Sequence, residues 1–132
     1  MDWITEHIAI GNHIDAHNVA LRKRFGFSAV VSLDGSMTAA AAEANGYDDW
    51  FITTLIDGAG NSFDLHRKII HALIDMAEGC PPVLVHCHAG RSRSVAVVAG
   101  YLVKTQGMSP KAAFDLLLAN VRRKFSRGLK FW

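Results

Sequence analysis

The run at residues 86–94, with the sequence His-Cys-His-Ala-Gly-Arg-Ser-Arg-Ser, constrains the fold of this 132-residue chain more than any other segment. The apolar run at residues 83–85 precedes it and the apolar run at residues 95–99 follows it. The first is typical of a strand buried on both faces and the second of a buried helix. The run between them is therefore a loop that ends at a helix N-terminus, where backbone N–H groups bind phosphate-like anions.

Each residue type in this loop suits phosphate chemistry. The helix N-terminus and the neighbouring cations are expected to lower the pKa of Cys87 and to favour the nucleophilic thiolate. The guanidinium of Arg93 presents a planar fork of donors that fits two phosphate oxygens at once. Gly90 lets the backbone come close to a ligand. The hydroxyl of Ser94 is expected to hydrogen-bond the sulfur.

The pattern His-Cys-x-Ala-Gly-x-Ser-Arg-Ser is similar to the signature loop of the dual specificity phosphatases, within the cysteine-dependent protein tyrosine phosphatase superfamily. Weaker resemblances to the same family lie at residues 8–12, 15–18, 100–103 and 109–114. The resemblance implies an enzyme of about one domain's length, residues 1–132, which hydrolyses phosphotyrosine, phosphoserine and phosphothreonine in proteins through a phosphocysteine intermediate.

The resemblance also implies roles for individual residues. Cys87 would attack phosphorus, Ser94 would assist the departure of the thiolate, and His86 would hydrogen-bond around the loop and help to keep the cysteine ionised. The oxygens of the substrate would be held by the loop residues His88, Ala89, Gly90, Arg91, Ser92 and Arg93.

The general acid is predicted to be Asp57. It lies 30 residues before Cys87 in the sequence, in the run Asp-Gly-Ala-Gly-Asn that is typical of a loop, where the resembled family carries its acid. A carboxylic acid on such a loop can protonate the leaving oxygen. An aspartate before glycine is also common in ordinary turns. Asp64 is the nearest rival, but its position in the first turn of a predicted helix is explained by the helix dipole.

The charge distribution leaves the substrate class open. Residues 1–86 carry five Lys and Arg against eleven Asp and Glu, a net charge of −6, whereas residues 87–132 carry nine against one, a net charge of +8. The basic half can attract anionic substrates, although the cluster at residues 122–130 also suits a solvated helix end. His88 and Arg91 are similar to the basic loop residues of phosphoinositide-directed relatives, so a phosphoinositide or other polyanionic phosphate is the alternative substrate. No nucleic-acid-binding motif is present.

Two alternatives come from other functional classes. A phosphate-binding module without turnover usually lacks the nucleophile, the arginine or the acid, and all three are available in this sequence. A sulfur-transfer or reductase domain also uses a cysteine loop, but the run Ala-Gly-x-Ser-Arg-Ser and the upstream aspartate argue against it.

Strand-like and helix-like segments alternate along the chain. This predicts an α/β fold of the phosphatase type and of minimal length, with a central, largely parallel sheet of about four or five strands flanked by helices. We expect helices at residues 16–24, capped by Asp15, at residues 38–46, and after the predicted caps Ser62 and Ser109. The loop at residues 86–94 would lie at the carboxyl end of its strand, where ligands bind in such sheets.

The remaining composition sets further expectations. Cys80 and Cys87 are too few for a disulfide framework and are expected to be reduced, which indicates a cytoplasmic location. No apolar run reaches the ~20 residues of a membrane span, and no secretory signal is visible. His13 and His17 are four residues apart and His86 and His88 are two apart. No carboxylate or cysteine partner lies at ligand spacing from these pairs, so neither a metal nor a cofactor is expected. The resembled family usually continues into one more helix, whereas this chain ends soon after its last predicted one. We therefore expect a minimal or a trimmed form, with its apolar surface covered by a partner, and the oligomeric state stays open.

Overall fold

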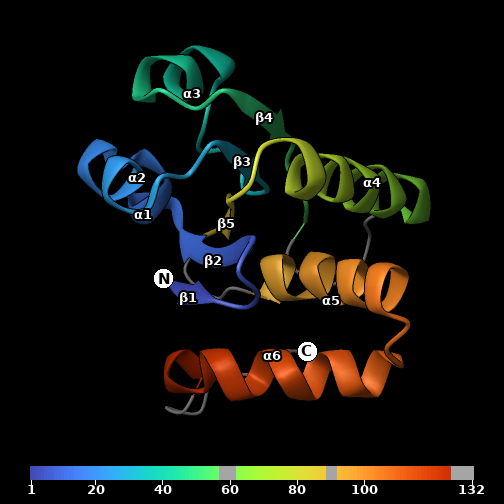
Figure 1. Ribbon diagram of the computed structural model, residues 1–132. Coiled ribbons are helices and arrows are strands. Elements are labelled where there is room, and N and C mark those ends of the chain that lie inside the picture. Colours follow the sequence, from blue (N-terminus) through green and yellow to red (C-terminus); the bar gives the residue numbers. More distant parts are fainter. Residues whose placement is uncertain (57–61, 89–91, 126–132) are drawn as a thin grey trace.

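The core of the fold is a five-stranded sheet with the strand order β1-β2-β5-β3-β4. The computed structural model describes residues 1–56, 62–88 and 92–125, with side chains described up to residue 121. The strands are β1 (Asp2–Trp3), β2 (Ile8–Asn12), β3 (Ala29–Ser32), β4 (Asp49–Ile52) and β5 (Val83–Cys87). All neighbouring pairs are parallel except the edge pair β1 and β2 (Figure 1). The predicted α/β fold with a largely parallel sheet is therefore confirmed.

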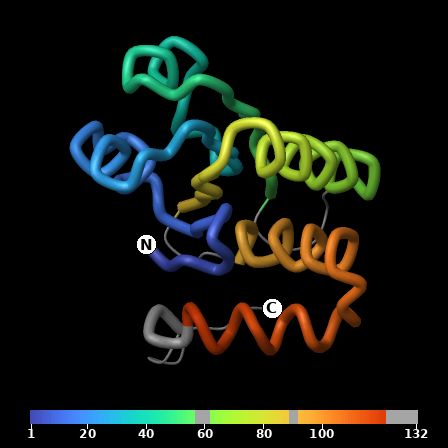
Figure 2. The backbone as a smooth tube through the Cα atoms, viewed as in Figure 1, coloured from blue at the N-terminus to red at the C-terminus, as the bar shows by residue number. Residues whose placement is uncertain are grey.

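Helices cover both faces of this sheet. The helices are α1 (His13–His17), α2 (Val19–Phe25), α3 (Ala39–Asn45), α4 (Phe63–Gly79), α5 (Ser92–Gln106) and α6 (Pro110–Phe125). Figure 2 follows the chain through α1, α2 and α3 on one side and through α4, α5 and α6 on the other, with α6 beneath α5. Because strand side chains alternate between faces, Val83 and Val85 pack toward the second group and Leu84 toward the first.

The central strand and its neighbours hold the core together. All five residues of β5 are buried, as expected for a parallel strand between two helical layers. Helix α5 contributes Val95, Val97, Val98 and Leu102 to the larger of the two apolar clusters. The prediction of a buried helix directly after the cysteine loop is therefore confirmed.

Local sequence signals account for most helix ends. The side chains of Thr38, Ser62 and Ser109 accept hydrogen bonds from the backbone N–H groups of the first turns of α3, α4 and α6. Gly46 follows α3 with a φ of 106°, in the left-handed conformation that glycine adopts readily at a helix end. These boundaries agree with the predicted ones.

The prediction of one helix over residues 16–24 is wrong, because the segment starts earlier and is divided into two helices. The structure has two short helices, capped by Asn12 and Asn18, whose side chains accept from the N–H groups of Asp15 and Leu21. Asp15 is the third residue of α1 and accepts from the N–H of Asn12, which completes a capping box. An asparagine that caps a new helix also interrupts the previous one, so Asn18 divides the segment.

Candidate active site

The strand β5 delivers the predicted nucleophile to the carboxyl edge of the sheet. Cys87 is its last residue and is 1% exposed. In the sheet register Cys87 lies opposite Asn12 of β2, and His86 lies opposite Ser32 of β3. The segments that follow β2, β3 and β5 therefore start at the same edge, as in parallel sheets that bind ligands at their carboxyl ends (Figure 1).

Helix α5 places Arg93 directly after the loop that follows Cys87. Arg93 is the second residue of the helix, and its Nη1 atom donates a hydrogen bond of 2.9 Å to the backbone carbonyl of Leu55. Leu55 is buried and lies two residues before the predicted acid Asp57. The bond thus joins the start of α5 to the segment that leads to Asp57.

Several predicted site residues lie outside the described part of the chain. Asp57 belongs to residues 57–61, and Ala89, Gly90 and Arg91 make up residues 89–91. Their roles stay predictions. The described members of the predicted site are His86, Cys87, His88, Ser92, Arg93 and Ser94.

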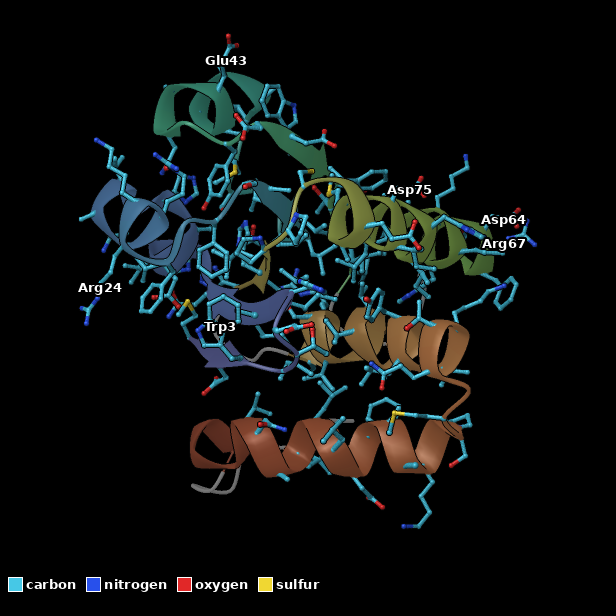
Figure 3. The ribbon with its side chains drawn as sticks, viewed as in Figure 1. Trp3, Arg24, Glu43, Asp64, Arg67 and Asp75 are labelled. Carbon is cyan, nitrogen blue, oxygen red and sulfur yellow. The ribbon has the colours of Figure 1, made fainter. Side chains whose placement is uncertain are left out.

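The rival acid Asp64 lies on the surface of α4. Its carboxylate is 3.5 Å from the guanidinium of Arg67, one turn further along the helix, and both side chains are exposed. Figure 3 shows both pointing outward at the same end of the helix. An exposed ion pair one turn apart on a helix surface needs no catalytic explanation.

His86 occupies a buried site in which it is neutral. Burial lowers its pKa to about 4, although the nearby carboxylate of Asp34 opposes this. Its Nδ1 is 4.0 Å from Asp34 Oδ1, which is too long for a hydrogen bond. Neither ring nitrogen has a hydrogen-bond partner among the described residues. The predicted hydrogen bond around the loop therefore stays a prediction.

Ser94 is fully buried in the first turn of α5. Its Oγ atom has no hydrogen-bond partner within residues 1–56, 62–88 and 92–121. The expected hydrogen bond from Ser94 to the Cys87 sulfur is thus not formed in this structure. A hydroxyl without a partner is available to a sulfur or a substrate oxygen, because a buried polar group gains from a hydrogen bond.

Asp34 is a site residue that the sequence analysis missed. It follows β3, its side chain is 2% exposed, and its Oδ1 accepts a hydrogen bond of 3.0 Å from the N–H of Ser36. Burial alone would raise the pKa of Asp34. The hydrogen bonding of Ser36, the charge of Arg93 and, under acidic conditions in which its ring is protonated, the charge of His86 instead bring this pKa below its usual value. Asp34 is therefore an anion beside the predicted loop.

A signal for Asp34 did exist in the sequence. Residues 29–33 form a short, β-branched run that is typical of a strand, and Asp34 follows this run directly. The carboxyl ends of parallel strands share an edge. A polar residue that directly follows any strand of such a sheet is a candidate site residue. What the sequence alone lacked was the strand order, which places β3 next to β5.

The fold and this edge define a class of protein. A parallel sheet that ends in a buried cysteine, followed by a helix with arginine in its first turn, is the arrangement expected of a cysteine-dependent phosphatase. Comparison with known proteins agrees. Residues 8–132 match the family described as dual specificity phosphatase, catalytic domain, and the chain belongs to this family. The family and the fold imply a cysteine-based phosphatase enzyme.

Individual relatives show how far the similarity extends. Dual specificity protein phosphatase 1B of Arabidopsis thaliana is 31% identical over 118 residues, which cover 86% of this chain and 67% of that protein. Phosphatidylglycerophosphatase and protein-tyrosine phosphatase 1 of Rattus norvegicus is 39% identical over 75 residues, which cover 56% of this chain and only 37% of that protein. The crystal structure of a mouse protein described as a dual specificity phosphatase, complexed with zinc tungstate, has a TM-score of 0.80 and 25% identity, and the match covers 99% of this chain and 80% of that one.

The helices in the described ranges include none with the length and apolar character needed to cross a membrane. Both cysteines are free thiols; Cys80 is partly exposed and Cys87 is buried.

Proposed function

We propose that this chain removes phosphate from phosphotyrosine, phosphoserine and phosphothreonine in proteins. The observation that carries the proposal is the placement of Cys87 at the carboxyl end of a buried strand, directly before the helix whose second residue is Arg93. The membership of the dual specificity phosphatase family supports the same reaction.

The reaction uses two displacements at phosphorus. The Cys87 thiolate attacks the phosphorus atom, a sulfur–phosphorus bond forms, and the bond to the leaving oxygen breaks. Asp57 gives its proton to that oxygen. Water then attacks the phosphocysteine, Asp57 takes a proton from it, and inorganic phosphate and the thiolate are released. Ser94 assists this departure by donating a hydrogen bond to the sulfur.

Binding of the phosphoryl group is assigned to Arg93 and to the loop His88, Ala89, Gly90, Arg91 and Ser92. The guanidinium of Arg93 already donates to the Leu55 carbonyl through Nη1, so its remaining donors are the ones offered to phosphate oxygens. The same bond ties the helix to the segment before Asp57, so that substrate binding and proton donation are built on one linked framework.

Phosphoproteins are the favoured substrate class. A phosphoinositide or other polyanionic phosphate is the second candidate. The rat relative is named as a phosphatidylglycerophosphatase, which acts on a phospholipid, as well as a protein-tyrosine phosphatase, and His88 next to the nucleophile is 60% exposed and open to a ligand. A panel of phosphopeptides and soluble phosphoinositides separates the two. Higher kcat/KM for the phosphopeptides supports the first, and higher kcat/KM for the phosphoinositides overturns it.

A cytoplasmic location is part of the proposal. A thiolate nucleophile has to stay reduced, and the cytoplasm keeps thiols reduced. Imaging of the tagged full chain tests this, and a signal confined to a secretory compartment would contradict it.

The mechanism is tested by three substitutions. Cys87→Ser should abolish turnover of p-nitrophenyl phosphate and keep phosphate binding. Asp57→Ala should slow turnover of phosphopeptides by about 10²–10⁴, and it should slow p-nitrophenyl phosphate less, because nitrophenolate needs little protonation. Asp64→Ala, in the exposed pair with Arg67, is the matched control and should retain activity. Full turnover by Cys87→Ser would refute the cysteine mechanism, and no turnover by the wild-type chain would refute an enzyme and favour a binding module.

A further inference from the structure

Three potential metal ligands from separate elements meet at the carboxyl edge of the sheet. His13 is the first residue of α1, Asp34 follows β3 and His88 follows β5. One ligand atom from each lies within 4.8 Å of the other two. The spacing along the sequence suggested different pairs, His13 with His17 and His86 with His88. In the structure the Nδ1 atom of His17 is instead 2.7 Å from the backbone carbonyl of His13.

Two of these side chains present buried polar atoms that have no partner within the described residues. They are Nδ1 of His13 and Oδ2 of Asp34. The other carboxylate oxygen of Asp34 already accepts from Ser36, so Oδ2 is the atom left over. Nδ1 of His88 is 3.7 Å from this oxygen, beyond hydrogen-bond distance. Buried polar atoms without a partner require an explanation, and a bound ion or water is one.

The two imidazoles are already arranged side by side. The rings of His13 and His88 stack with their centroids 4.4 Å apart and their planes 9° from parallel. The ligand atoms of the two rings and of the Asp34 carboxylate lie within 4.8 Å of one another. Because the nitrogen lone pairs lie in the parallel ring planes, one ring has to turn before both can bind one ion. Because Asp34 is 2% exposed, its negative charge is poorly solvated and would gain from a cation.

We propose that His13, Asp34 and His88 bind one divalent transition-metal ion of the zinc type. Two imidazoles and one carboxylate are a ligand set that suits zinc, whereas Mg²⁺ and Ca²⁺ prefer oxygen ligands throughout. Three protein ligands leave the fourth tetrahedral position for water or a substrate oxygen.

Binding of one ion requires the ligand atoms to come closer and the His88 ring to turn out of the stack. Zinc binds nitrogen and oxygen at about 2.0–2.2 Å, so the ligand atoms of a tetrahedral site lie about 3.4 Å apart. The present separations of up to 4.8 Å have to shorten by somewhat more than 1 Å. His88 can supply this change, because its side chain is 60% exposed and can rotate.

The ion would link α1 and the end of β3 to the residue that follows the nucleophile. It would thereby fix the side chain of His88 and add positive charge beside the predicted phosphate loop. Binding of the metal does not require turnover, so it can be measured in a protein that lacks the nucleophile. Its failure and the failure of the proposed phosphatase reaction are therefore distinguishable.

The test uses the full chain, free of any histidine tag, with both Cys80→Ser and Cys87→Ser to remove thiolate ligands. Zinc affinity is measured by competition with a chromophoric chelator, and Co²⁺ is added as a spectroscopic probe. We expect one equivalent of Zn²⁺ and visible Co²⁺ absorption bands of a tetrahedral or five-coordinate site. His13→Ala and Asp34→Asn should each weaken zinc binding at least tenfold, and Mg²⁺ should not compete.

His71→Ala is the matched control, because His71 is exposed on α4 and lies outside the three-residue group. It should bind zinc like the parent. Circular dichroism checks the fold of each variant, and His13→Ala decides the question by itself if Asp34→Asn does not fold. Absence of a stoichiometric zinc site in the parent, or undiminished binding by His13→Ala, would overturn the proposal.

Discussion

Replacement of Tyr47 by phenylalanine should change how the stability of the protein depends on alkaline pH. Tyr47 follows α3, is 3% exposed, and donates a hydrogen bond of 2.8 Å from its hydroxyl to the backbone carbonyl of Ala16 in α1. Burial raises the pKa of Tyr47 to about 12; the cation of Arg22 opposes the rise and the carboxylate of Asp15 adds to it. The contact supports α1, the helix that begins at His13.

The magnitude follows from proton linkage. The unfolded chain loses the tyrosine proton near pH 10 and the native protein keeps it to about pH 12. Between these values the native state binds more protons, so the free energy of unfolding falls as the pH rises. The stabilisation is complete below about pH 10 and is lost near pH 12. At about 1.36 kcal/mol for each pKa unit, deprotonation of Tyr47 lowers the free energy of unfolding by about 2–3 kcal/mol between about pH 10 and pH 12.

The assay is urea denaturation of the wild-type chain and of Tyr47→Phe at several pH values from 8 to about 12. Near pH 8 the variant should be less stable by about 1–3 kcal/mol, because the Ala16 carbonyl loses its donor. The difference should then shrink by about 2–3 kcal/mol toward pH 12. Tyr101→Phe, at the only other tyrosine, is the control and should follow the wild-type curve. A constant difference between wild type and Tyr47→Phe would refute the argument.

Three further outcomes are expected. Arg93→Lys should lower kcat/KM for p-nitrophenyl phosphate about 10–100-fold. Lysine lacks the planar fork of donors, so the variant loses a charge-assisted hydrogen bond to phosphate that contributes about 1.5–3 kcal/mol. Unchanged kinetics would contradict this. In a Cys87→Ser background, Cys80 should react with iodoacetamide more slowly than a free thiol at pH 8, because burial and two acidic neighbours raise the pKa of Cys80. Mass spectrometry follows the reaction. A rate equal to that of a free thiol would show that Cys80 is not protected. Leu117→Ala should lower the free energy of unfolding by about 2–5 kcal/mol in denaturant titrations, since Leu117 is fully buried on α6. A loss below about 1 kcal/mol would mean that α6 is poorly packed.

Most of the fold could be predicted because local signals agree with the overall topology. The runs at residues 29–33 and 83–85 contain the strands β3 and β5. The helix α3 lies in the predicted range 38–46, and α4 and α6 begin after the predicted caps Ser62 and Ser109. The division between α1 and α2 was missed because Asp15 and Asn18 are both good caps, and the sequence alone does not decide between them. The capping box with Asn12 decides it in the structure.

Some residues of the candidate site could be predicted from local sequence signals, and others could not. Cys87 and Arg93 could be predicted because they lie within one short run and act through local geometry, a strand end and a helix start. The proximity of Asp34 to His86, His88 and Arg93 could not be predicted, because it depends on the position of β3 beside β5. That position is a property of strand order, which no local pattern encodes.

The same reasoning explains why a possible metal site was rejected from spacing. Ligand spacing along one helix or one turn is informative only where a single element supplies several ligands. In a parallel sheet, one residue after each of several strands reaches the common edge, so ligands there are separated by whole βα units in the sequence, as His13, Asp34 and His88 are. A sequence search for sites at such an edge therefore has to compare strand ends across the sheet rather than residues within a segment. In this chain, a comparison of strand ends identifies His13 and Asp34 as neighbours of His88, the residue that follows the nucleophile.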